Sequence, residues 1–140
     1  MNKAYCIHDQ FEIYFLTFTI TDWIDVFTRR NHCLIFLETL AFCRKFKGLK
    51  VYAYVIMTNH VHLIVNSEVG QLTSVIRDIK SYAAFRLINE ITEGRESRKE
   101  WMLKRFEFAA RKNKKNVKYK FWQDGYHAKQ VDSENLCVGN

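Results

Sequence analysis

Two histidines separated by a single residue are the side chains of this sequence best suited to bind a metal ion. His60 and His62 lie in the stretch Met-Thr-Asn-His-Val-His-Leu at residues 57–63. Alternate side chains of a strand share a face, so both imidazoles would project together while Val61 and Leu63 point to the core. Two neutral imidazoles on one face make half of a divalent metal site. The alternative is a pair of polar side chains on a solvent-exposed face. The apolar runs around them favour the metal site, because polar groups without partners are costly there.

Basic side chains are the second feature with a chemical meaning, and they gather late in the chain. The formal net charge is +7, and residues 95–120 alone hold 11 basic and three acidic residues. Aromatic residues interleaved with them could pack a helix against the core or stack on nucleic-acid bases. We therefore expect contact with nucleic acid rather than a merely solvated helix face. The interleaved aromatic residues are Trp101, Phe106, Phe108, Tyr119 and Phe121, and the candidate DNA-binding residues are Arg77, Lys80, Arg111, Lys112, Lys114, Lys115, Lys118 and Lys120.

The elements that must position these side chains follow from the spacing of apolar residues. Runs rich in β-branched and aromatic residues predict strands, and apolar residues at three- and four-residue spacing predict helices. A gap of only three residues, 58–60, between two strand-like runs predicts a tight antiparallel hairpin that includes the first histidine. The predicted elements are a strand at 13–20, a helix at 31–46, strands at 49–57 and 61–65, helices at 74–91 and 99–112, and an extended segment at 117–131.

This order predicts an α+β fold of the ferredoxin-like, RNA-recognition-like kind, with helices on one face of an antiparallel sheet. A chain of 140 residues with 48% hydrophobic residues fits one domain over residues 1–140. Exposed edge strands of such a sheet favour a homodimer. The longest apolar run, residues 13–20, is far shorter than the roughly 20 residues of a membrane helix. Four scattered cysteines without a Cys-x-x-Cys pair argue against a disulfide framework, so we expect a cytoplasmic protein without a membrane span.

Several of these segments together resemble a known family. The core Met-x-Asn-His-Val-His-Leu, the helical segment at residues 79–82 and the segment Phe-Trp-Gln-Asp-Gly-Tyr-His at residues 121–127 follow the first strand in the family order. The chain resembles the single-tyrosine transposases with a His-hydrophobic-His motif, in particular the group related to REP-associated tyrosine transposases. The resemblance extends over nearly the whole chain.

The resemblance implies a DNA strand transferase that works as a dimer on single-stranded DNA, often at a hairpin. In such enzymes the histidine pair, here His60 and His62, binds Mg²⁺ or Mn²⁺, and a tyrosine hydroxyl attacks the scissile phosphate. The products are a 5′-phosphotyrosyl link and a free 3′-hydroxyl, and rejoining reverses the step.

The sequence departs from the family pattern after the Trp-Gln segment, where the nucleophilic tyrosine and a third metal ligand are expected on a helix. No tyrosine follows Tyr126 and the chain has no proline, so we expect a chain truncated before that helix and impaired in catalysis. The secondary candidates for the nucleophile are Tyr82, on a helix, and Tyr126, with Gln130 about 13 Å away along an extended segment. Two further interpretations remain, namely a non-catalytic single-stranded nucleic-acid binding module and an unrelated ferredoxin-like metalloenzyme.

Overall fold

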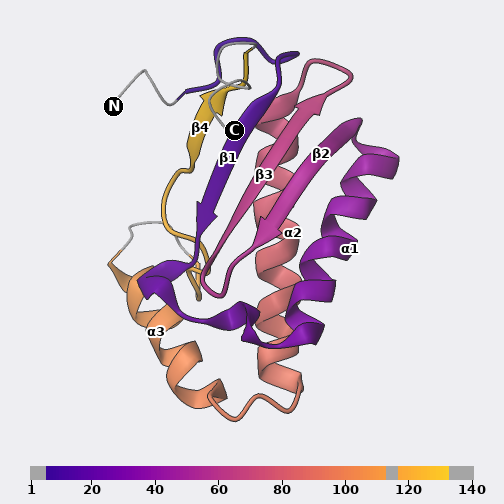
Figure 1. Cartoon of the computed structure of the whole chain (residues 1–140). Helices are drawn as coiled ribbons and strands as arrows, with labels where there is room; N and C mark the ends of the chain where they lie inside the picture. Colours follow the sequence, from indigo (N-terminus) through magenta and orange to yellow (C-terminus); the bar gives the residue numbers. More distant parts are fainter. Residues whose placement is uncertain (1–5, 113–116, 133–140) are drawn as a thin grey trace.

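A computed structural model describes residues 6–112 and 117–132. Its four strands form one antiparallel sheet with the order β2-β3-β1-β4. Helices α1 and α2 lie side by side behind this sheet, and α3 lies beyond its lower end (Figure 1). Two short 3-10 turns connect β1 to α1. The elements are β1 (Tyr14–Thr19), η2 (Thr21–Trp23), η3 (Val26–Thr28), α1 (Arg30–Phe46), β2 (Leu49–Ile56), β3 (His60–Ser67), α2 (Leu72–Glu93), α3 (Lys99–Arg111) and β4 (His127–Gln130).

The core lies between the sheet and the two helices behind it. Alternate residues of the two central strands are buried, because every second side chain of a strand faces the helices. Apolar residues of α1 and α2 complete the same cluster. The α+β, ferredoxin-like fold expected from the element order is thereby confirmed. The buried set includes Tyr14, Leu16 and Phe18 of β1, Val61, Leu63 and Val65 of β3, Phe36 and Leu40 of α1, and Ile76, Ile79 and Leu87 of α2.

Two of the differences from the predicted elements have a tertiary reason. Helix α2 begins at Leu72 rather than at residue 74, because Leu72 is buried and the Gln10 side chain accepts a hydrogen bond from the Thr73 amide at 2.8 Å. Such a remote cap leaves no local signal. The segment at residues 117–131 forms only a short strand, His127–Gln130, preceded by an isolated antiparallel bridge between Trp122 and Ile20. The side chains of Phe121 and Trp122 are buried in the core.

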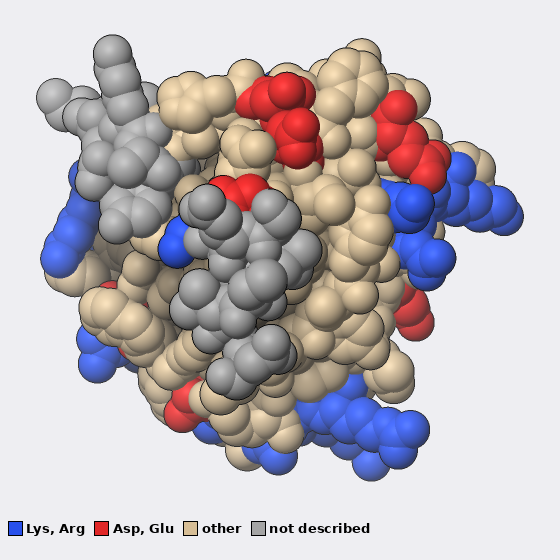
Figure 2. Space-filling view, turned by 45° about the horizontal axis from the view of Figure 1, so that its top comes forward, with Lys and Arg blue, Asp and Glu red and all other residues tan. Residues whose placement is uncertain are grey.

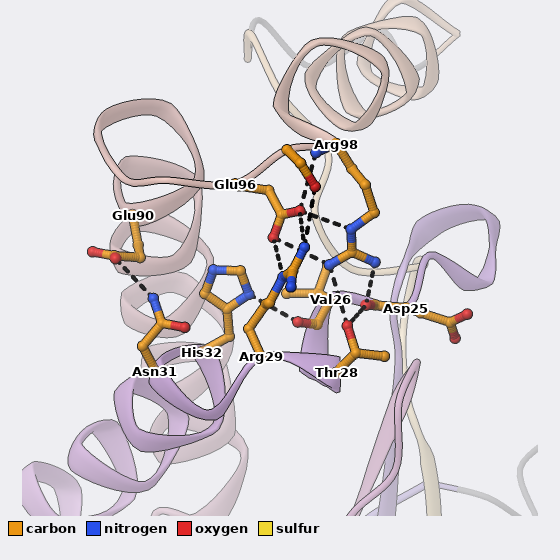
Figure 3. A network of polar contacts seen from close by, with 10 residues as sticks. Asp25, Val26, Thr28, Arg29, Asn31, His32, Glu90, Glu96 and Arg98 are labelled. Atoms are coloured by element: carbon orange, nitrogen blue, oxygen red, sulfur yellow. Dashed lines mark hydrogen bonds and ion pairs between the residues drawn. The ribbon is translucent and has the colours of Figure 1, made fainter.

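A buried carboxylate fixes the connection between α2 and α3 (Figure 3). The Glu96 side chain is only 2% exposed and accepts hydrogen bonds from Arg98 Nε at 2.8 Å and Arg29 Nε at 3.0 Å. Arg98 also donates to the carbonyl oxygen of Asp25 at 2.9 Å. Hydrogen bonds from Arg98, and then from Arg29, hold the pKa of the Glu96 carboxyl well below its usual range. The start of α3 is therefore attached to the turn that leads into α1.

None of the helices in the described part of the chain is both long and apolar enough to cross a membrane.

Candidate metal and DNA-binding site

His60 and His62 lie side by side at the start of β3, on the face of the sheet turned away from α1 and α2. Their ring centroids are 4.8 Å apart and the rings meet edge to face at 78°. The intervening Val61 and the following Leu63 are buried in the core, as the alternation of a strand requires. Phe15 of β1 stacks on the His62 ring at 5.2 Å. The two imidazoles therefore share one exposed face and a defined mutual orientation.

One nitrogen of each ring is engaged by a neighbouring polar side chain. The Nδ1 atom of His60 lies 2.8 Å from Asn59 Oδ1, and the Nδ1 atom of His62 lies 2.9 Å from the Thr17 hydroxyl. An amide oxygen only accepts, so the His60 Nδ1–H donates and the lone pair of Nε2 remains available. The same follows for His62 when the Thr17 hydroxyl accepts. Hydrogen bonds of this kind orient metal-binding histidines in proteins.

The electrostatic surroundings favour the neutral form of His62. Partial burial, followed by the neighbouring His60, lowers the pKa of His62 below its ordinary value. A neutral imidazole is the form that binds a metal, so this shift favours binding at neutral pH.

The donor set of the pair fits two nitrogen ligands of a divalent cation. Within residues 6–112 and 117–132, no group of three or more His, Cys, Asp or Glu side chains comes together that could hold an ion. Oxygen atoms of water or of a phosphate are further ligands that suit Mg²⁺ and Mn²⁺.

The two tyrosines considered as nucleophiles lie on the wrong side of the sheet for this pair. Tyr82 is exposed on the outer surface of α2, edge-on to Phe42 of α1 at 5.7 Å. Tyr126 packs edge-on against the buried ring of Phe18 at 5.9 Å, and burial raises its pKa. The sheet and its core therefore separate both hydroxyls from the histidine face, and the structure does not bring either together with His60 and His62.

The predicted DNA-binding residues divide into engaged and outward-facing side chains. The Lys80 ammonium donates to the Gly125 carbonyl at 2.5 Å and lies over the rings of Phe18 and Tyr126, so its role is internal. Lys120 pairs with Asp124 at 2.7 Å. These contacts give both ammonium groups partners within the protein, and the assignment of Lys80 and Lys120 to a DNA surface stays a prediction.

The remaining candidates within the described residues are exposed. Arg77 bonds the Ser74 hydroxyl at 3.2 Å, Arg111 pairs with Glu107, and Lys112 and Lys118 each lie over an aromatic ring. Lys114 and Lys115 lie outside the described residues. In Figure 2, Lys and Arg side chains stand at the margins of the face shown and acidic side chains gather toward its upper edge.

A family model described as "Transposase IS200 like" matches residues 14–106, which include β1, the histidine pair and most of α3. The chain belongs to the IS200-like transposase family. The family resemblance inferred from the sequence is confirmed, and an unrelated ferredoxin-like metalloenzyme is excluded.

Solved structures agree with this IS200-like fold. A REP-associated tyrosine transposase bound to a REP hairpin matches with a TM-score of 0.62 at 11% identity, over 99% of this chain and 67% of that one. A candidate transposase from Deinococcus radiodurans R1 matches with a TM-score of 0.58 at 15% identity, over 99% of this chain and 92% of that one. No curated protein matches the chain.

Sequence reasoning missed two positioning side chains of this IS200-like chain. Thr17 is one of two threonines in an apolar strand, and only the register that sets it opposite His62 shows its role. Asn59 carries a usable signal, because it directly precedes the His-Val-His core. The same register sets His127 of β4 opposite Thr17 on its other side, which places three polar residues in one row across the sheet.

Proposed function

We propose that this chain binds single-stranded DNA and belongs to a transposase that nicks and transfers DNA strands with a divalent cation at His60 and His62. The observation that carries the proposal is the pair of imidazoles on the open face of the sheet, each oriented through Nδ1. Family membership supplies the reaction class. A DNA hairpin is the proposed target, in keeping with the hairpin bound by the REP-associated relative.

Each residue has a defined part in this proposal. His60 and His62 would hold Mg²⁺ or Mn²⁺ through their Nε2 atoms, and Asn59 and Thr17 orient the two rings. A divalent cation held there would polarise the scissile phosphate and offset its negative charge. A tyrosine hydroxyl, as in the family, forms the new bond to phosphorus, and the bond to the 3′-oxygen breaks to leave a 5′-phosphotyrosyl link and a 3′-hydroxyl.

DNA binding and DNA cleavage are proposed to separate in this chain. Tyr82 and Tyr126, the two candidates from the sequence, lie across the core from the histidine pair. Neither of these two hydroxyls is positioned to attack a phosphate bound at the pair, so the chain should act mainly as a binding module. This observation favours the non-catalytic alternative for the isolated chain.

The proposal extends to a homodimer formed along the free edge of β2. This strand ends the sheet, and several of its residues are exposed, including Tyr54 and Val55. Unpaired backbone groups of an edge strand invite pairing with a second copy. Light scattering over a range of concentrations tests this part, and a monomer at high concentration would contradict it.

The test of the function uses labelled single-stranded oligonucleotides and Mn²⁺. Filter binding measures the complex, and denaturing electrophoresis detects a covalent protein–DNA species. We expect binding with little or no covalent product. Calorimetry should show that the double variant His60→Ala/His62→Ala no longer binds Mn²⁺, whereas His8→Ala, an exposed histidine elsewhere, binds it normally. Unchanged Mn²⁺ binding in the double variant would overturn the site, and a covalent adduct mapped to Tyr82 or Tyr126 would overturn the separation of binding from cleavage.

A further inference from the structure

A strained turn with an exposed indole lies next to the histidine pair. Asp22 and Trp23 of η2 have φ values of 55° and 51°, the left-handed region that residues with a Cβ rarely adopt. The Trp23 side chain is 64% exposed. Two consecutive left-handed residues, one of them a tryptophan, cost free energy and persist only where the surroundings fix them.

Contacts with the β2–β3 connection hold this turn against the metal site. The Asn59 amide nitrogen donates to the Trp23 carbonyl at 3.4 Å, while the oxygen of the same amide accepts from the His60 ring at 2.8 Å. The Ile20 amide donates to the Asn59 carbonyl at 2.9 Å. One side chain, Asn59, thus contacts both the turn that carries Trp23 and a proposed metal ligand.

The other side of the turn contacts α3. Arg105 Nη1 lies 3.8 Å from Asp22 Oδ2, and Figure 1 shows α3 beside the chain that follows β1. Helix α3 therefore continues the surface that starts at His60 and passes over η2.

Helix α3 carries two separate apolar stripes. The inner one is fully buried and attaches the helix to the core, with Phe106 against Phe121. The outer one holds Trp101, 47% exposed, and Phe108, 54% exposed, seven residues apart and hence about 10 Å along the axis. The outer pair adds nothing to the core. It lines a shallow surface pocket together with Lys104, Arg105, Glu107 and Arg111.

The charge around this outer stripe is complementary to a nucleic-acid strand. Residues 98–112 hold six basic and two acidic residues. One of the acidic side chains, Glu107, is paired with Arg111, and the Lys112 ammonium lies 4.5 Å from the centre of the Phe108 ring. Exposed aromatic rings among basic side chains are the arrangement on which proteins stack unpaired bases while binding the phosphates.

We propose that Trp23, Trp101 and Phe108 form an aromatic track on which unpaired bases of single-stranded DNA stack, leading from the histidine pair over η2 onto α3. Lys104 and Arg111 bind phosphates along this track. The inference rests on the proposed function and names the part of the DNA that this surface takes. Duplex DNA keeps its bases stacked on one another, so the track selects unpaired strands.

The test measures fluorescence anisotropy of a labelled 20-nucleotide oligothymidine and of a blunt duplex of the same length. Trp23→Ala, Trp101→Ala and Phe108→Ala should each weaken single-strand binding roughly fivefold or more and leave duplex binding unchanged. Phe85→Ala is the matched control, because Phe85 is 68% exposed on the outer surface of α2, away from the track. Trp23→Phe keeps an aromatic face and should retain most of the affinity.

The outcomes separate the track from the proposed function. Wild-type protein that binds no single strand overturns both. If the wild type binds single strands and all three alanine variants bind them equally well, the aromatic track is overturned but the proposed function is not. The same conclusion follows if the variants lose affinity equally for duplex and for single-stranded DNA. If Trp23→Ala fails to fold, quenching of indole fluorescence by oligothymidine in the folded Trp101→Phe protein reports on Trp23, since Trp122 is buried. Absence of quenching there contradicts stacking at Trp23.

Discussion

The hydroxyl of Thr17 on β1 lies 2.9 Å from the Nδ1 atom of His62 on the neighbouring strand β3, and the two residues are direct partners in the antiparallel register. The contact fixes the orientation of a ring that otherwise rotates about its side-chain bonds. A proposed metal ligand on one strand is thus positioned by a hydroxyl on another.

Replacing Thr17 by valine should weaken Mn²⁺ binding without removing a ligand. Valine keeps the shape of threonine but has no hydroxyl, so His62 loses the bond that orients its ring. Losses of this kind are about 10- to 100-fold in metal affinity. Calorimetry on Thr17→Val measures the effect, and Thr17→Ser, which keeps the hydroxyl, is the control. Equal affinities in all three proteins would show that the contact has no positioning role.

The Glu96 network should make the free energy of unfolding depend on pH in the acid range. The pKa of Glu96 is lowered in the folded protein from its ordinary value of about 4.5. The ionised Glu96 carboxylate therefore contributes fully to the free energy of unfolding above about pH 4.5. This contribution decreases as the pH falls toward the pKa of Glu96 in the folded protein. Glu96→Gln should unfold more easily at pH 7, by about 2–3 kcal/mol, since bonds to charged groups are lost.

Urea unfolding of the wild type and of Glu96→Gln at pH 7 and pH 3 measures the effect. The difference between their free energies of unfolding should be smaller at pH 3. Glu107→Gln removes an exposed partner of Arg111 and should change stability by less than about 1 kcal/mol. A Glu96→Gln variant as stable as the wild type at pH 7 would show that the network contributes nothing to folding.

Two aromatic residues of α3 should respond differently to truncation. Phe106 is fully buried against Phe121, so Phe106→Ala should cost roughly 3–5 kcal/mol. Trp101 faces outward, so Trp101→Ala should change the free energy of unfolding by at most about 0.5 kcal/mol. Chemical denaturation of the two variants measures both values. A large loss in Trp101→Ala would mean that the outer stripe belongs to the core.

The salt dependence of DNA binding should distinguish lysines that bind phosphates from lysines whose ammonium groups contact other parts of the protein. Binding to single strands weakens with salt with a slope of about −0.7 per phosphate contacted, so Lys104→Ala should reduce the slope by about that amount. Lys80→Met should leave the slope unchanged, because its ammonium already contacts the Gly125 carbonyl. Titrations at four salt concentrations provide the slopes. A reduced slope in Lys80→Met would restore Lys80 to the DNA surface.

The sequence predicted the fold well because its strands have a clear period of two and its first two helices a clear apolar spacing. His60 and His62 could be placed on one face for the same reason. The internal role of Lys80 could not be predicted, since its partner Gly125 is 45 residues away and offers only a carbonyl group. The sequence also could not show that Phe106 is buried whereas Phe108 is exposed. This depends on which side of α3 packs against Phe121, and both sides of the helix carry apolar residues.

The interior position of β3 makes the histidine pair sensitive to single-residue insertions and deletions. Because β3 is paired with β2 on one side and β1 on the other, it has no free edge along which to slip. Shifting its register by one residue would turn His60 and His62 into the core and expose Val61 and Leu63. Insertions and deletions should therefore be tolerated better in the connection between α2 and α3 than within β3. Within β3, inserting or deleting an odd number of residues would move the two histidines to the core face.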